Sequence, residues 1–170
     1  SRNARLRPMS IRGPPSTGLA TSIDVGPLSG LAFDHGFDGR HFQSQPALFA
    51  AQRFRTWLKR AGITVSHRTR TGITPAGSPA LVQWPSPPMA EILRRMNQPS
   101  DNYMAETLIK TLGATFGSGG STAAGAAVVR GAVGRLGVRP RLYDGSGLSR
   151  GDRTSPNQVV TLLRAMSRRS

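Results

Sequence analysis

The feature that most constrains the fold is the helical spacing of apolar residues from position 46 onward. They recur every three or four positions, in segments that proline or glycine bounds. This period places apolar side chains on one face of a helix and predicts helices rather than strands. The predicted helices cover residues 46–62, 88–97, 101–112, 122–136 and 157–166. Small residues dominate the fourth segment, which predicts a closely packed, buried helix.

Short β-like runs between turns suggest strands elsewhere. These runs cover residues 18–25, 28–33, 63–71, 81–84 and 138–143. Residues 1–45 show little helical pattern, so the fold class predicted is α+β, with a β-rich part over 1–45 and a mainly helical part over 46–170.

The charge of the chain is strongly basic, at +15 with 23 basic and 8 acidic residues. Such a charge favours an anionic partner: nucleic acid, anionic lipid or cell-wall polymer. Arginine accounts for nearly all of the basic residues, a skew that GC-rich coding sequence also produces, and the arginines are spread along the chain. We therefore expect no specific nucleic-acid binding, but weak nonspecific binding at low salt and peripheral contact with a membrane or wall.

Several classes of protein are excluded by composition. The chain has no cysteine, which rules out disulfides, thiol catalysis and cysteine zinc sites. His35, His41 and His67 have no metal-ligand spacing with acids or with one another, so we expect no metal and no organic cofactor. No apolar run is long enough for a transmembrane helix, and the N-terminal residues resemble neither a signal peptide nor a natural start.

The segment Gln98–Glu106 holds a Ser-x-Asn tripeptide, Ser100 to Asn102, directly after a proline. One interpretation is structural: Ser100 caps a helix and Asp101 favours its dipole. The other is chemical, because a hydroxyl both donates and accepts a proton and an amide offers both a donor and an acceptor. The tripeptide alone favours the structural interpretation, so the choice depends on its surroundings.

Those surroundings resemble a known family. Residues 85–102, followed by Met-Ala-Glu-Thr-Leu and Leu112-Gly113, are similar to the second-motif region of S13 D-Ala-D-Ala carboxypeptidases. The loop Asp144-Gly-Ser-Gly-Leu-Ser-Arg150 with Thr154-Ser-Pro156, and the segment 46–65, resemble other parts of that family in the same order. The resemblance covers about residues 46–166. It implies the helical part of a penicillin-binding, serine β-lactamase-like domain over 46–170, preceded by a β-rich remnant of an inserted domain over 1–45.

The resemblance also implies roles for individual residues. Ser100 would relay a proton between the catalytic lysine and the leaving amine, and Asn102 would hold the peptide group of the substrate. The 144–149 loop would lie beside the cleft as a structural turn, with Ser146 as a weaker candidate for substrate contact. The parent protein would act outside the cytoplasmic membrane on peptidoglycan stem peptides, through an acyl-serine, as a carboxypeptidase and also an endopeptidase. β-Lactams would inhibit it.

Two of the family's catalytic motifs do not occur in this chain. It has no Ser-x-x-Lys and no Lys-Thr-Gly. Thr56–Lys59 and Thr107–Lys110 have the right spacing but lie in predicted amphipathic helices, where we expect surface pairs. Truncation explains this pattern, and predicts a chain that is inactive alone. The alternatives are a noncatalytic muropeptide-binding relative and a basic nucleic-acid-binding module.

Overall fold

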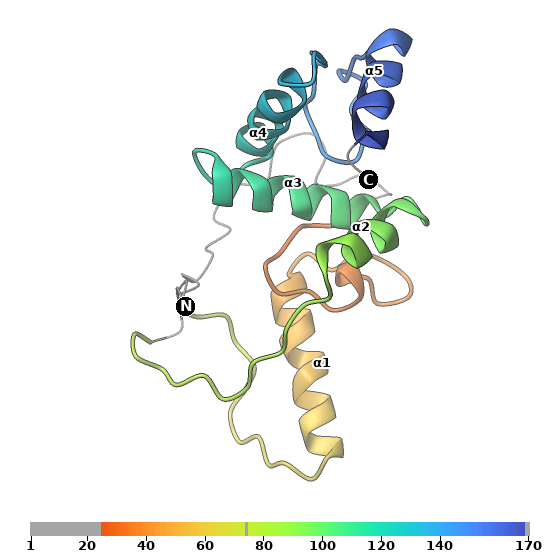
Figure 1. Ribbon diagram of the computed structural model, residues 1–170. Coiled ribbons are helices and arrows are strands. Elements are labelled where there is room, and N and C mark those ends of the chain that lie inside the picture. Colours follow the sequence, from red (N-terminus) through yellow and green to blue (C-terminus); the bar gives the residue numbers. More distant parts are fainter. Residues whose placement is uncertain (1–24, 74, 169–170) are drawn as a thin grey trace. The chain divides into compact units, whose positions relative to one another are not determined.

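The computed structural model describes residues 25–73 and 75–168, and this part is mostly helical (Figure 1). Its contacts separate Gly26–Asp101 from the part that begins at Asn102, so each is considered by itself. The helices are the 3₁₀ turn η1 (Asp34–Gly36), α1 (Pro46–Arg60), α2 (Met89–Asn97), α3 (Asn102–Phe116), α4 (Thr122–Gly134) and α5 (Pro156–Ser167). The domain boundary at residues 45/46 stays a prediction.

Helix α1 packs against the turn that precedes it. Pro46 stands at its start, where the missing N–H costs nothing and the fixed φ suits a helix. The rings of Phe33 and Phe49 meet edge to face with centroids 6.1 Å apart, and the Arg53 guanidinium lies 5.2 Å from the centre of Phe33. This aromatic and cation–π cluster holds α1 to η1, and Pro46 and Ala50 are the buried residues of α1.

The chain between α1 and α2 is extended but forms no sheet. Strands were predicted over residues 63–71 and 81–84, and the described residues there make no strand ladder. The prediction was wrong because a strand needs a neighbour for its backbone groups, and these segments have none in the described part of the chain. Most apolar side chains between α1 and α2 face solvent, and Ile73, Leu81, Val82 and Trp84 are at least 82% exposed.

Helices α3 and α4 approach so closely that their backbones touch. A Cβ on Gly125 would lie 1.8 Å from the carbonyl oxygen of Ile109, and one on Gly113 would lie 2.7 Å from the Gly125 nitrogen. Glycine at both crossing positions makes this approach possible. Tyr103, Ile109, Ala124 and Ala126 are the buried apolar residues of the two helices. The expectation of a closely packed fourth helix is thus confirmed for its first half.

Helix α5 follows a loop that contains no regular strand. The predicted strand over 138–143 reduces to one antiparallel bridge between Arg141 and Arg153. Ser155 accepts a hydrogen bond from the Gln158 nitrogen at 3.3 Å and Pro156 is the first helical residue, which confirms the predicted start. An apolar cavity of about 280 Å³ is lined by α4, α5 and the segment between them. No residue of α5 is buried.

The remaining sequence expectations differ in outcome. The helix predicted to end near Leu112 continues to Phe116, and the one predicted to end at Leu136 stops at Gly134. The strand predicted over residues 28–33 does not form. Most of the strand predicted over 18–25 lies outside the described residues. In the described part, no helix combines the length and apolarity that crossing a bilayer requires.

Candidate active site

Ser100 occupies an unusual backbone conformation after α2. Its φ is +58°, in the left-handed region that favours glycine. The Asp101 nitrogen donates to the Met96 oxygen at 2.8 Å and the Ser100 nitrogen to the Asn97 oxygen at 3.3 Å. These two bonds form a Schellman motif, which closes a helix C-terminus around one left-handed residue. Ser100 is therefore the terminating residue of α2 and not the cap of the following helix.

Two other helices end with the same motif, and both use glycine. At α1 the left-handed residue is Gly62, with φ of +80°, and at α4 it is Gly137, with φ of +79°. A non-glycine residue in this conformation costs about 1 kcal/mol. The serine at position 100 thus costs stability at a place where the chain elsewhere uses glycine.

A second contact holds the turn that carries Ser100. The Nε2 atom of His35 lies 3.3 Å from the Oδ2 atom of Asp101, whose side chain is 13% exposed. His35 itself has a φ of +53° at the 3₁₀ turn η1. The sequence analysis found no metal-ligand spacing for His35, and no spacing could have revealed a contact across more than sixty residues.

Asn102 is the first residue of α3 and begins its inward face. Glu106 and Ile109 follow at four and seven positions, so they continue the same face of the helix, and both are buried. Asn102 is partly buried. Ser100 thus ends the turn that closes α2, and Asn102 begins α3 two residues later.

The Glu106 carboxylate binds the loop at residues 144–149. Its Oε1 atom accepts from the Gly145 nitrogen at 2.8 Å, the Ser146 nitrogen at 2.9 Å and the Ser146 hydroxyl at 2.8 Å. Glu106 is 6% exposed, so these charge-assisted bonds form with little water present. They connect Glu106 of α3 with Ser146, forty residues later in the chain. The Ser146 hydroxyl hydrogen is committed to Glu106, which leaves its oxygen as an acceptor.

The carboxylates of Asp144 and Asp152 bind further backbone N–H groups in and next to the loop. Asp144 accepts from the nitrogens of Gly147 and Ser149, at 2.7 and 2.6 Å, and Asp152 accepts from the Tyr143 nitrogen at 2.7 Å. Burial raises the pKa of Asp152, with the Asp144 and Glu106 carboxylates adding to the rise and the Tyr143 N–H opposing it. The loop is a structural turn, as expected; its position beside a cleft stays a prediction.

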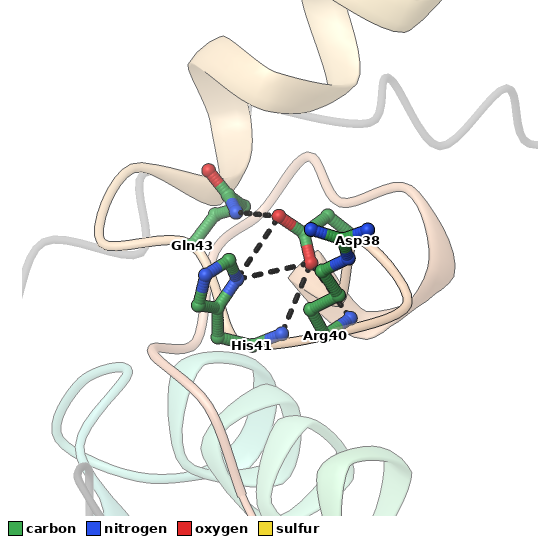
Figure 2. A network of polar contacts seen from close by, with 4 residues as sticks. All are labelled: Asp38, Arg40, His41 and Gln43. Atoms are coloured by element: carbon green, nitrogen blue, oxygen red, sulfur yellow. Dashed lines mark hydrogen bonds and ion pairs between the residues drawn. The ribbon is translucent and has the colours of Figure 1, made fainter.

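A separate polar network surrounds Asp38, ahead of α1 (Figure 2). The Asp38 carboxylate accepts from the backbone nitrogens of Arg40 and His41, at 2.8 and 3.0 Å, and from Gln43 Nε2 at 2.7 Å. These donors, the His41 N–H first, lower the pKa of Asp38 to about 2. The network closes the turn between the bridged residues Phe37 and Phe42. Among the described residues, no group of histidines and acids could hold a metal ion.

The two Thr-x-x-Lys pairs differ from each other. Thr56 is exposed and donates to the Gln52 oxygen at 3.0 Å, and Lys59 is exposed, so this pair lies on the surface as expected. Thr107 and Lys110 are partly buried, and the Thr107 hydroxyl oxygen is shielded from solvent. The expectation of a surface pair was wrong there, because the inward face of α3 is wider than its apolar residues alone suggest.

The sequence analysis therefore proposed Ser100, Asn102 and Ser146, and the structure adds His35, which contacts Asp101 next to Ser100, and Glu106, which binds Ser146. Glu106 stands within the Met-Ala-Glu segment that contributed to the family resemblance, yet nothing in that segment shows which backbone groups it binds. The roles of Ser100, Asn102 and Ser146 stay predictions.

Comparison with known proteins connects this arrangement to a family. The family model described as "D-Ala-D-Ala carboxypeptidase 3 (S13) family" matches residues 39–170. A D-alanyl-D-alanine carboxypeptidase of Actinomadura sp. (strain R39) is 35% identical over 125 residues, which are 70% of this chain and 23% of the relative. The chain thus spans about a quarter of the length of that relative. The chain belongs to the S13 family of D-Ala-D-Ala carboxypeptidases.

Proposed function

We propose that this chain is part of an enzyme that releases the terminal D-alanine of peptidoglycan stem peptides, and also cuts cross-links, through an acyl-serine intermediate. It acts outside the cytoplasmic membrane and is inhibited by β-lactams. Residues 46–170 contribute the helical side of a penicillin-binding domain, and residues 1–45 come from an inserted domain. Family membership supports the reaction class.

The observation that carries the proposal for the site is the conformation of Ser100. The chain has serine where the ends of α1 and α4 have glycine, with φ of +58° against +80° and +79°. Strained residues of this kind concentrate at functional sites, where the strain is offset by the chemistry that the side chain performs. A helix end needs no serine hydroxyl there, whereas a proton relay does.

Each residue then has a defined task. The Ser100 hydroxyl passes a proton from the activating lysine, which lies outside this chain, to the amine that leaves. The Asn102 amide binds the peptide group of the substrate with its donor and acceptor. Glu106 fixes the 144–149 loop, so that the Ser146 oxygen can accept a hydrogen bond from the substrate. No metal or organic cofactor takes part.

The chain by itself forms no acyl-enzyme, because its sequence has no Ser-x-x-Lys. The first test is the mass of the intact chain after incubation with benzylpenicillin, and we expect no change. A covalent adduct would overturn the proposed inactivity. Peptide mapping would then identify the nucleophile among Ser100, Ser146, Thr56 and Thr107.

A second test addresses Ser100 within an active S13 polypeptide that contains this segment. Ser100→Ala should lower the rate of acylation by about 10²- to 10⁴-fold, the range for loss of positioned proton transfer. Thr56→Ala, at the exposed pair on α1, is the matched control and should keep the parent rate. Equal rates for Ser100→Ala and the parent would remove Ser100 from the mechanism.

A further inference from the structure

Two segments that enter and leave the 144–149 loop are joined through their arginines. The Arg141 nitrogen donates to the Arg153 oxygen at 2.8 Å, and the Arg153 nitrogen donates to the Arg141 oxygen at 2.9 Å. This double exchange defines a hydrogen-bonded antiparallel pair, in which the two Cα atoms lie about 5.5 Å apart and both side chains emerge on the same face. The backbone therefore places the two arginine side chains on one face.

The opposite face of these segments is apolar. Val138, Pro140, Leu142 and Thr154 line the cavity between α4 and α5, which has a volume of about 280 Å³. Neighbouring residues in an extended segment point to opposite faces. The alternating residues Arg139, Arg141 and Arg153 are exposed. Val138, Pro140 and Leu142 are thus directed inward, and the arginines and Tyr143 outward.

Other arginines gather around this pair without carboxylate partners. The Arg130 side chain of α4 donates to the Leu142 oxygen at 3.0 Å, and Arg153 reaches the Arg150 oxygen. In the described part of the chain, every ion pair lies between residues 35 and 101. The nearby acids Asp144 and Asp152 accept from backbone N–H groups instead.

Like charges directly opposite each other destabilise a strand pair. An external anion would therefore offset the repulsion between the Arg141 and Arg153 side chains. We propose that the arginine face, defined as Arg130, Arg139, Arg141, Arg150 and Arg153, binds the phosphodiester groups of an anionic cell-wall polymer. A guanidinium matches the geometry of a phosphate with two parallel hydrogen bonds, and several guanidiniums on one face suit a repeating anion.

A polymer fits this face better than a membrane surface does. Interfacial membrane binding needs several apolar side chains beside the cations, whereas Val138, Pro140 and Leu142 line the cavity and Tyr143 is the exposed aromatic residue of these segments. The choice of a wall polymer rests on the proposed extracytoplasmic function, whereas the arginine face itself does not depend on it.

The test is the affinity of the whole chain for a synthetic poly(glycerol phosphate) oligomer, measured by titration over a range of salt concentrations. The double variant Arg141→Ser/Arg153→Ser should bind roughly tenfold more weakly. The slope of log affinity against log salt should become shallower by about 1.4, from two lost contacts at about 0.7 each. Arg141→Lys/Arg153→Lys keeps the charge but not the geometry of the guanidinium. Its affinity should lie between those of the wild type and the serine double variant.

The matched control is Arg68→Ser/Arg70→Ser, which removes the same two charges from exposed positions in the extended chain. It should change the affinity much less. An equal loss in both double variants would mean that only net charge matters, and would overturn the arginine face. Equal binding to polyglutamate would overturn the phosphodiester preference, and stronger binding to anionic lipid vesicles would overturn the polymer. None of these measurements requires acylation, so they are independent of the penicillin test.

Discussion

Each of the two parts of the molecule is stabilised internally by a different kind of interaction. From Asn102 onward, α3 and α4 touch through their backbones at Gly113 and Gly125, and a buried carboxylate binds a distant loop. In Gly26–Asp101, one aromatic cluster packs on α1, whose buried residues are Pro46 and Ala50. The difference teaches that Asn102 and Ser146 belong to a tightly packed frame, whereas Ser100 depends on a local turn.

The largest expected effect comes from the backbone contact of α3 and α4. Gly125→Ala would place a Cβ 1.8 Å from the Ile109 oxygen, so the helices would have to separate. We expect a loss of about 3 kcal/mol in the free energy of unfolding, at the upper end for an overpacked core. Denaturant unfolding followed by far-UV circular dichroism measures it.

Gly131→Ala is the control on the same helix, because a Cβ there meets nothing within 4 Å. It should raise the free energy of unfolding by about 0.5–1 kcal/mol, since alanine favours the helix. If both variants unfold alike, the backbone contact does not exist in solution and the contrast between the two parts fails.

The second effect concerns the buried carboxylate. Glu106→Ala leaves the Gly145 and Ser146 N–H groups without their acceptor, and should cost about 2–3 kcal/mol. Glu106→Gln keeps one acceptor oxygen and should cost less. Amide hydrogen exchange at Gly145 and Ser146 would report the loss locally, while exchange at His41 should not change. Faster exchange at all three would mean that the two parts unfold together.

The third effect sharpens the comparison at Ser100. Ser100→Gly removes the cost of a left-handed side chain and should raise the free energy of unfolding by about 0.5–1 kcal/mol. Gly62→Ser is the reciprocal change at the end of α1, where a Cβ has open space, and should lower it by a similar amount. Thermal unfolding measures both. A destabilised Ser100→Gly would show that the serine is present for its structure and not for its chemistry.

The smallest effect depends on pH. The pKa of Asp38 falls from 3.8 to about 2 in the folded chain, so its carboxylate contributes stability above the unfolded value. That contribution is lost as the pH falls from about 3.8 to about 2. Wild type should therefore unfold at a higher temperature than Asp38→Asn near neutral pH, and the two should converge in acid. Gln43→Met is the control, because it removes one donor to Asp38 but leaves the Asp38 carboxylate free to titrate. If the difference in melting temperature between wild type and Asp38→Asn persists in strong acid, the pH dependence does not come from Asp38.

The helices could be predicted from sequence because their signals are local. Proline at the start of α1, serine and proline at the start of α5, and apolar residues at helical spacing fix each helix within a few positions. The strands could not, since the runs at 63–71 and 81–84 have the composition of strands but lack partners in the described chain. A strand is defined by its neighbour, and composition does not specify one.

Of the candidate site, only the residues of the Ser-x-Asn motif and the 144–149 loop could be predicted from the sequence. Ser100 and Asn102 were predicted as site residues from their order within a recognisable segment, without any use of geometry. The contact of His35 with Asp101 and the bonds of Glu106 to the 144–149 loop join residues far apart in the chain. Such contacts follow from tertiary packing, which periodicity and spacing do not encode.

The extended chain between α1 and α2 has a consequence for the solubility of the protein. No charged residue lies between Arg70 and Glu91, and Leu81, Val82 and Trp84 are almost fully exposed. Uncharged apolar runs without backbone partners are where intermolecular β-aggregation starts. Prolines interrupt this run at positions 75, 79, 85, 87 and 88, and a proline cannot donate to a growing ladder. These prolines oppose aggregation, so replacing Pro79 and Pro85 should allow this exposed segment to form intermolecular β-structure and nucleate fibrils.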